Sequence, residues 1–285
     1  MAALAVARYT LVELSRRRLL GVFVGIGIFL TAGIGIAPLV LPGFRSADDR
    51  TIFILGGISR VDGLALELCA FAIGMTVINH DLDSGAIVGI LSKPVTRLSY
   101  SVGKLAAALF LLFLLGSILT AGSMLAVELN SGGHMEVLFW FFAAGVANMM
   151  LLMILVMDLT VYLNNIVAAA IVVTLTFVQN QVSVLYALVQ QNVITTPIHE
   201  DVVRVFYWLV PHPLVSNLDR DITITQFNLN CATGCAGMQP DPAAYLAQEL
   251  SRIPGATGNG DIVYWFAYLA VACGILYLAL RRKQV

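Results

Sequence analysis

Charged residues are scarce in this chain. Asp, Glu, Lys and Arg make up 12% of its 285 residues, 59% of the residues are hydrophobic, and the mean hydropathy is +0.88. A soluble domain carries about 25% charged residues. The composition therefore excludes a soluble domain and indicates an integral membrane protein. The net charge of −1, with no basic patch interleaved with aromatic residues, gives no sign of nucleic-acid binding.

Motifs for the common kinds of catalysis are also missing. The chain has no Gly-x-x-x-x-Gly-Lys-Ser/Thr phosphate-binding loop, because Gly103-Lys104 lacks both the upstream glycine and the following hydroxyl residue. Its four histidines are scattered without a His-Glu-x-x-His pair, and no Gly-x-Ser-x-Gly occurs. We therefore expect this chain to be no enzyme and to hold no metal and no cofactor of its own.

Cysteine is rare, and four cysteines are too few for a disulfide scaffold. Cys69 and Cys273 lie in apolar runs and are expected to be packing residues. Cys231 and Cys235, by contrast, lie close together in a polar stretch. We predict a local disulfide between these two, and half of a metal site is the alternative that the spacing leaves open.

Apolar runs long enough to cross a bilayer, which takes about 20 residues, are plentiful. Six are expected, over residues 19–41, 61–79, 104–127, 137–157, 166–189 and 261–280. They predict an all-α, six-helix transmembrane domain over residues 19–285, with a polar loop over residues 44–59. Residues 1–18 set apolar side chains against arginines, which predicts an interfacial amphipathic helix on the membrane surface.

One long loop, residues 190–260, separates the last two spans. Within it, residues 202–210 are apolar and aromatic but too short to cross, and Pro211 and Pro213 end the run. They predict a short re-entrant or interfacial helix. Residues 216–260 are polar and rich in turn residues, and we expect them to form a small cap.

Lys and Arg are divided unevenly between the two sides of this predicted bundle. Ten fall on the side of the two termini and six on the side of the long loop. Because cytoplasmic loops carry an excess of basic residues, we expect both termini in the cytoplasm and residues 190–260 outside. The predicted location is the plasma or inner membrane, with lipid around the spans.

A polar segment between the second and third spans interrupts the apolar pattern. Asp83 or Ser84 can cap the start of a helix. Apolar residues follow at helical spacing until Pro94 ends the helix, and Arg97 comes after it. A helix this short is not stable alone, so we expect residues 85–93 to press against a partner.

This segment resembles the region between the second and third spans of the ABC type-2 transporter permease family. The resemblance rests on an acidic pair, Ser-Gly, a short apolar helix, Ser-Lys-Pro, a basic residue and Gly-Lys at the start of a span. In that family the short helix is the coupling helix, which docks on an ATP-hydrolysing subunit. The residues expected at this contact are Asp83, Ser84, Gly85, Ile87, Ile90, Leu91, Lys93, Pro94 and Arg97.

The resemblance implies the permease subunit of an ATP-driven exporter. Two copies of the membrane chain would pair with two cytoplasmic ATPase subunits, which bind the ATP and magnesium. It also implies that the second and fifth spans line the substrate path. Glu67 in the second span and Thr176, Gln179 and Asn180 in the fifth are the candidates, because a polar group inside a span is costly unless paired or wetted. Hydrogen bonding between helices is the alternative role.

Two other functions are compatible with the sequence. A stand-alone secondary transporter or channel would carry charged relays or broken helices in mid-membrane, and the predicted spans have little of either. A membrane anchor of an assembly or motility complex would have no substrate of its own. Co-purification of an ATPase would argue against the first, and ATP hydrolysis stimulated by a substrate would argue against the second.

Overall fold

The structure, a computed structural model, describes residues 2–15, 18–41, 47–83, 96–130, 135–190, 196–216, 218–232, 242–251 and 258–282. Its elements in these ranges are all α-helices, and no strand occurs among them. Six helices are long and apolar enough to cross a membrane. They are Gly21–Val40, Arg50–Asp81, Arg97–Asn130, Leu138–Thr160, Asn165–Val189 and Gly260–Arg282. The prediction of an all-α chain with six apolar spans is confirmed.

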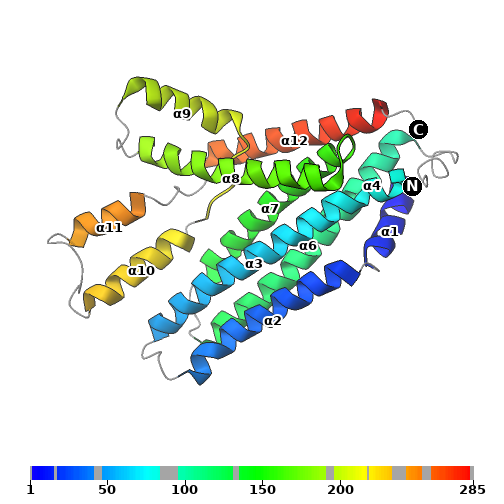
Figure 1. The fold of residues 1–285 in the computed structure, drawn as a ribbon. Helices are drawn as coiled ribbons and strands as arrows, with labels where there is room; N and C mark the ends of the chain where they lie inside the picture. Colours follow the sequence, from blue (N-terminus) through cyan, green and yellow to red (C-terminus); the bar gives the residue numbers. More distant parts are fainter. Residues whose placement is uncertain are drawn as a thin grey trace.

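Four long helices run side by side and form the core of the bundle (Figure 1). They are α2 (Arg18–Val40), α3 (Ala47–Val77), α6 (Arg97–Asn130) and α7 (Met135–Thr160). α8 (Asn165–Gln190) and α12 (Asn259–Arg282) pack against α7. Both termini lie at one end of the bundle, which we call the N/C end, and we call the opposite end the loop end.

α3 is the central helix. It contacts α2, α6 and α7, and 61% of its most apolar stretch is buried, compared with 17% for α8. Gly74 allows part of this close packing, because a Cβ atom there would lie only 2.9 Å from the carbonyl oxygen of Met153 on α7. α3 is therefore enclosed on several sides, whereas α8 is peripheral.

The second span begins earlier than predicted. α3 is helical from Ala47, so the polar loop expected over residues 44–59 is wrong from residue 47 onward. Ile54, Leu55 and Ile58 then pack into a buried cluster with α6, α7 and α10. Packing therefore extends the helix beyond its most apolar stretch.

The third span also begins early. α6 starts at Arg97 rather than at residue 104, and it continues to Asn130. Its first turns contain polar residues, but Tyr100 and Lys104 are buried. Contacts with other helices at the N/C end therefore hold a part of α6 that is not itself strongly apolar.

Shorter helices flank the bundle. They are α1 (Ala2–Ser15) and α4 (Asn79–Asp83) at the N/C end, and α9 (Pro197–Leu209), α10 (Leu218–Ala232) and α11 (Pro242–Ser251) toward the loop end. α9 folds back along α8 (Figure 1). The turn-rich cap expected over residues 216–260 thus contains two helices. α10 is stabilised because Leu218 and Ile222, four residues apart, pack against the cluster at the start of α3.

Candidate functional site

A cavity of about 240 Å³ lies between α3, α7, α8 and the chain that follows α9. Its polar lining residues come from three helices and one loop. They are Glu67, Asn148, Thr176, Gln179, Asn180 and His212. All four residues that the sequence nominated for a substrate path therefore line one cavity. The rest of the lining has no polar side chain and consists of four leucines with Gly63, Met149, Val172, Pro211 and Pro213.

Three of these polar side chains have no partner within the described part of the chain. The Glu67 carboxylate is half-buried and forms no hydrogen bond or ion pair there, and the side-chain amides of Gln179 and Asn180 form none either. Thr176 differs, because its hydroxyl donates to the carbonyl oxygen of Val172 at 3.0 Å. Free polar groups within apolar helices are costly unless water or a solute satisfies them. The cavity wall can therefore bind a polar group.

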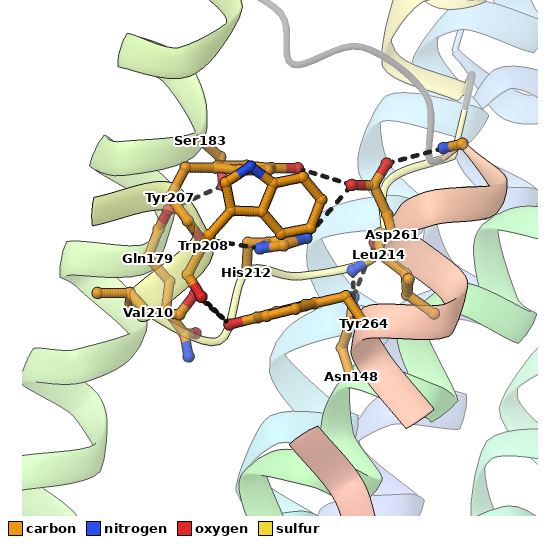
Figure 2. A network of polar contacts seen from close by, with 11 residues as sticks. Asn148, Gln179, Ser183, Tyr207, Trp208, Val210, His212, Leu214, Asp261 and Tyr264 are labelled. Carbon is orange, nitrogen blue, oxygen red and sulfur yellow. Dashed lines mark hydrogen bonds and ion pairs between the residues drawn. The ribbon is translucent and has the colours of Figure 1, made fainter. Parts of the chain in front are cut away.

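Asn148 has a structural role in the wall (Figure 2). Its side-chain Nδ2 donates to the carbonyl oxygen of Leu214 at 2.9 Å, and the backbone N–H of Leu214 donates to its Oδ1 at 2.8 Å. The side chain thus satisfies both backbone groups of one loop residue. This pair of hydrogen bonds fastens the loop after α9 to α7.

An aromatic stack surrounds the ring of His212, which lines the cavity (Figure 2). The His212 ring lies between Tyr207 on α9 and Tyr264 on α12, with centroid distances of 3.9 and 4.5 Å. Tyr186 of α8 stacks on the other face of Tyr207 at 3.8 Å, and Trp208 meets His212 edge-on. The stack joins α8, α9, the loop and α12, so it positions the cavity-lining His212 from several sides.

Asp261, at the start of α12, supports the stack from its polar side. Its Oδ1 accepts a hydrogen bond from the Tyr207 hydroxyl at 3.2 Å and lies 3.4 Å from Nε2 of His212. Its Oδ2 accepts from the backbone N–H of Gly258 at 2.8 Å. The other ring nitrogen of His212, Nδ1, lies 3.1 Å from the carbonyl oxygen of Tyr207 and must donate to it, because a carbonyl only accepts.

Burial has the largest effect on the pKa values of His212 and Tyr207. It lowers the pKa of His212 below its ordinary value of 6.5, although the carbonyl of Tyr207 and the carboxylate of Asp261 act in the opposite direction. Burial, followed by the neighbouring Asp261 carboxylate, raises the pKa of the Tyr207 hydroxyl. His212 is therefore neutral at neutral pH, with its proton on Nδ1.

A second polar cluster lies at the N/C end. Lys104 is fully buried, and its Nζ lies 2.8 Å from Oδ2 of Asp81 and 3.6 Å from Oε2 of Glu13. The hydroxyl of Tyr100 donates to the same Asp81 oxygen at 2.7 Å. These four residues, which we call the Lys104 cluster, connect α1, α4 and α6. Sequence reasoning missed the pairing, although an acidic and a basic residue on either side of one polar segment could have suggested it.

In the sequence, Asp81 and Lys104 of this cluster precede and follow the segment predicted to contact an ATPase. Residues 84–95, with seven of the nine predicted contact residues, lie outside the described ranges. Of the other two, Asp83 ends α4, and Arg97 begins α6 and donates to the carbonyl oxygen of Arg281 at 2.9 Å. Gly103 lets α1 approach α6, because a Cβ there would lie 2.6 Å from the carbonyl oxygen of Ala3.

Asp62 forms a third polar contact, separate from the cavity. It is fully buried in α3 and accepts hydrogen bonds from the hydroxyls of Thr31 on α2 and Ser123 on α6. Both carboxylate oxygens are thus used between helices. Asp62 is a packing contact of the bundle, unlike Glu67 one and a half turns further along α3.

The cysteines divide into two kinds. Cys69 is free and buried, and Cys273 is free and half-buried. Cys231 is disulfide-bonded, while Cys235 lies outside the described ranges, so the pairing of these two stays a prediction. No group of three metal-ligating side chains occurs among the residues that the structure describes.

Comparison with known proteins adds no relative to these observations. No family model matches the chain, and no curated protein matches it. The resemblance to the ABC type-2 permeases therefore rests on the residues of the segment between the second and third spans.

Proposed function

We propose that this chain is the membrane subunit of an ATP-driven exporter, whose ATPase subunits are separate cytoplasmic chains. The observation that carries the proposal is the cavity, which is lined by the side chains of Glu67, Gln179 and Asn180, and these have no partner within the described part of the chain. An anchor without a substrate gains nothing from unsatisfied polar groups at this position, and they reduce its stability. A substrate path needs such groups.

The arrangement of α3 supports coupling between this cavity and an ATPase. α3 carries Glu67 in the cavity wall, and α4 follows it directly and leads into residues 84–95. Because α3 is enclosed by its neighbours, a push on that segment moves α3 and the helices packed on it as one body. Because the Lys104 cluster ties α1 and α6 to α4, these two helices would move together with α3.

The exposed polar residues of α8 support pairing with a second copy of the chain. Asn180, at the edge of the cavity, and its neighbour Gln181 are exposed on this helix although it is long and apolar enough to span, whereas the hydroxyl of exposed Thr174 already donates to the carbonyl oxygen of Ala170. Lipid cannot satisfy the two amides, whereas a protein surface can. The proposed assembly therefore has two membrane chains and two ATPases, in the plasma or inner membrane, with α1 on the cytoplasmic surface and α9 re-entering from outside.

The proposal is tested by substituting Leu91, on the apolar face predicted to contact the ATPase. Leu91→Asp would place an uncompensated carboxylate in that contact. We expect the variant to insert in the membrane but to lose the co-purifying ATPase and ATP-dependent transport in liposomes. Ser92→Asp adds the same charge away from the apolar face of the predicted helix and should keep both. Transport by the purified chain alone, without ATP, would instead identify a secondary transporter.

A further inference from the structure

The cavity wall has one sign of charge. Glu67 is the only Asp, Glu, Lys or Arg among the described residues that line it. A second carboxylate, that of Asp261, lies directly behind the wall, 3.4 Å from Nε2 of His212. Of the basic residues on neighbouring turns, Arg60 is exposed outside the wall, and Arg204 on α9 pairs with Glu200. The field in the cavity is therefore negative.

His212 adds no positive charge to this wall near neutral pH. Its Nδ1–H donates to the carbonyl oxygen of Tyr207, and burial between two tyrosine rings lowers its pKa. Protonation at Nε2 would require a lower pH. A ligand in the cavity thus meets a carboxylate on α3 and a neutral imidazole in the loop.

The remaining groups of the wall fit an amphipathic molecule. The amide oxygens of Gln179 and Asn180 can accept hydrogen bonds from a protonated amine held near Glu67, and they can turn their negative ends toward a quaternary ammonium group, which has no N–H to donate. Leu151, Leu155 and Leu175 supply apolar surface beside them. A small polar head and an apolar body can therefore both be satisfied within about 240 Å³.

We propose that this cavity binds organic cations: amines or quaternary ammonium compounds with an apolar portion, held by the Glu67 carboxylate. An unpaired carboxylate among apolar helices gains most from a cation, which offsets its desolvation. An anion would meet repulsion from Glu67 and Asp261. This inference names the substrate class of the proposed exporter and rests on the cavity being its substrate path.

Direct binding to the full chain in nanodiscs of zwitterionic lipid, without any ATPase, tests the inference. The probe is benzyltrimethylammonium, followed by isothermal titration calorimetry, with neutral N,N-dimethylbenzamide and anionic benzenesulfonate as competitors of similar size. We expect saturable binding of the cation and no competition by the other two. Equal competition by the neutral or the anionic compound, or the absence of saturable cation binding, would overturn the inference.

Matched variants assign the binding to Glu67. Glu67→Gln removes the charge at nearly constant shape and should weaken binding about tenfold or more, as expected when a close pair of opposite charges in a partly buried site is lost. Glu67→Asp keeps the charge and should retain most of the affinity, while Glu128→Gln, at an exposed carboxylate elsewhere, should change nothing. Unchanged affinity in Glu67→Gln contradicts the assignment. Since the assay contains no ATPase, loss of ATPase association would refute the exporter without affecting this result.

Discussion

Nζ of Lys104 lies 2.8 Å from Oδ2 of Asp81, and the two side chains are only 1% and 2% exposed. Asp81 comes just before the segment predicted to contact an ATPase, and Lys104 follows it. The pair therefore joins the two ends of this segment inside the protein. A buried pair of this kind differs from a surface salt bridge, because the loss of one partner leaves the other charge buried and uncompensated.

The first prediction concerns this pair. Lys104→Met should destabilise the chain by about 3–5 kcal/mol, because Asp81 is left as an unpaired buried charge. Adding Asp81→Asn should recover part of that loss, and thermal unfolding of both variants in detergent measures it. Arg204→Met breaks the exposed pair with Glu200 and serves as the control, with an expected cost of about 0–1 kcal/mol. Equal effects of Lys104→Met and Arg204→Met would show that the Lys104 cluster is not structural.

The second prediction concerns the two hydrogen bonds that join Asn148 of α7 to Leu214 in the loop after α9. Asn148→Ala removes both hydrogen bonds to Leu214 and should cost about 1–3 kcal/mol. Hydrogen exchange at the Leu214 amide should become faster, because its acceptor is gone. Asn180→Ala removes an amide that has no partner in the described chain, so it should not destabilise the chain and should leave this exchange rate unchanged. An unaltered exchange rate in Asn148→Ala would contradict the conclusion that Asn148 fastens this loop to α7.

The third prediction is a pH dependence of stability that originates at His212. Its folded-state pKa is lowered below 6.5, so between the two pKa values the unfolded chain binds more protons than the folded one. Stability should therefore be highest above 6.5 and decrease as the pH falls toward the folded-state pKa. Thermal unfolding at a series of pH values measures this decrease.

A variant separates His212 from other titrating groups. His212→Phe keeps a ring in the stack but cannot titrate, so the decrease in stability on acidification should become smaller. His199→Gln, at an exposed histidine, is the control and should retain the full decrease. The same pH profile in His212→Phe as in the parent chain would assign the effect to other residues.

The fourth prediction is that Cys231 and Cys235 are bonded to each other. Both thiols should resist alkylation in the unfolded chain until a reductant is added, whereas Cys69 and Cys273 should react as soon as the chain unfolds. Mass spectrometry of the alkylated peptides distinguishes the two pairs. Alkylation of Cys235 without reductant would reject the pairing, and metal released with it would favour the metal-site alternative.

The fifth prediction is the orientation in the membrane. A cysteine introduced at Gln248 on α11 should react with a membrane-impermeant thiol reagent in intact cells, because the basic residues place this loop outside. A cysteine introduced at Ser92 should react only after the cells are opened. The opposite labelling pattern would reverse the topology, and with it the cytoplasmic position of the proposed ATPase contact.

The six spans could be predicted from the sequence because a helix of sufficient apolar length depends on local residues alone. The same holds for Glu67, Gln179 and Asn180, which stand out as polar exceptions within apolar runs. The helix over residues 47–60 could not be found in this way, since its stability comes from packing against helices far along the chain. Local sequence does not report such contacts.

The geometry of the cavity and of the Lys104 cluster was decided by the tertiary structure. Nothing near His212 in the sequence indicates that its ring lies between Tyr207 and Tyr264, because Tyr264 comes from a helix 52 residues further along. Likewise, the charges of Asp81 and Lys104 suggest a pair, but only the packing of the helices buries it. Helix formation is local, whereas burial and pairing depend on which helices meet. The sequence therefore determined the spans and their polar exceptions, and packing decided which of those exceptions share one cavity.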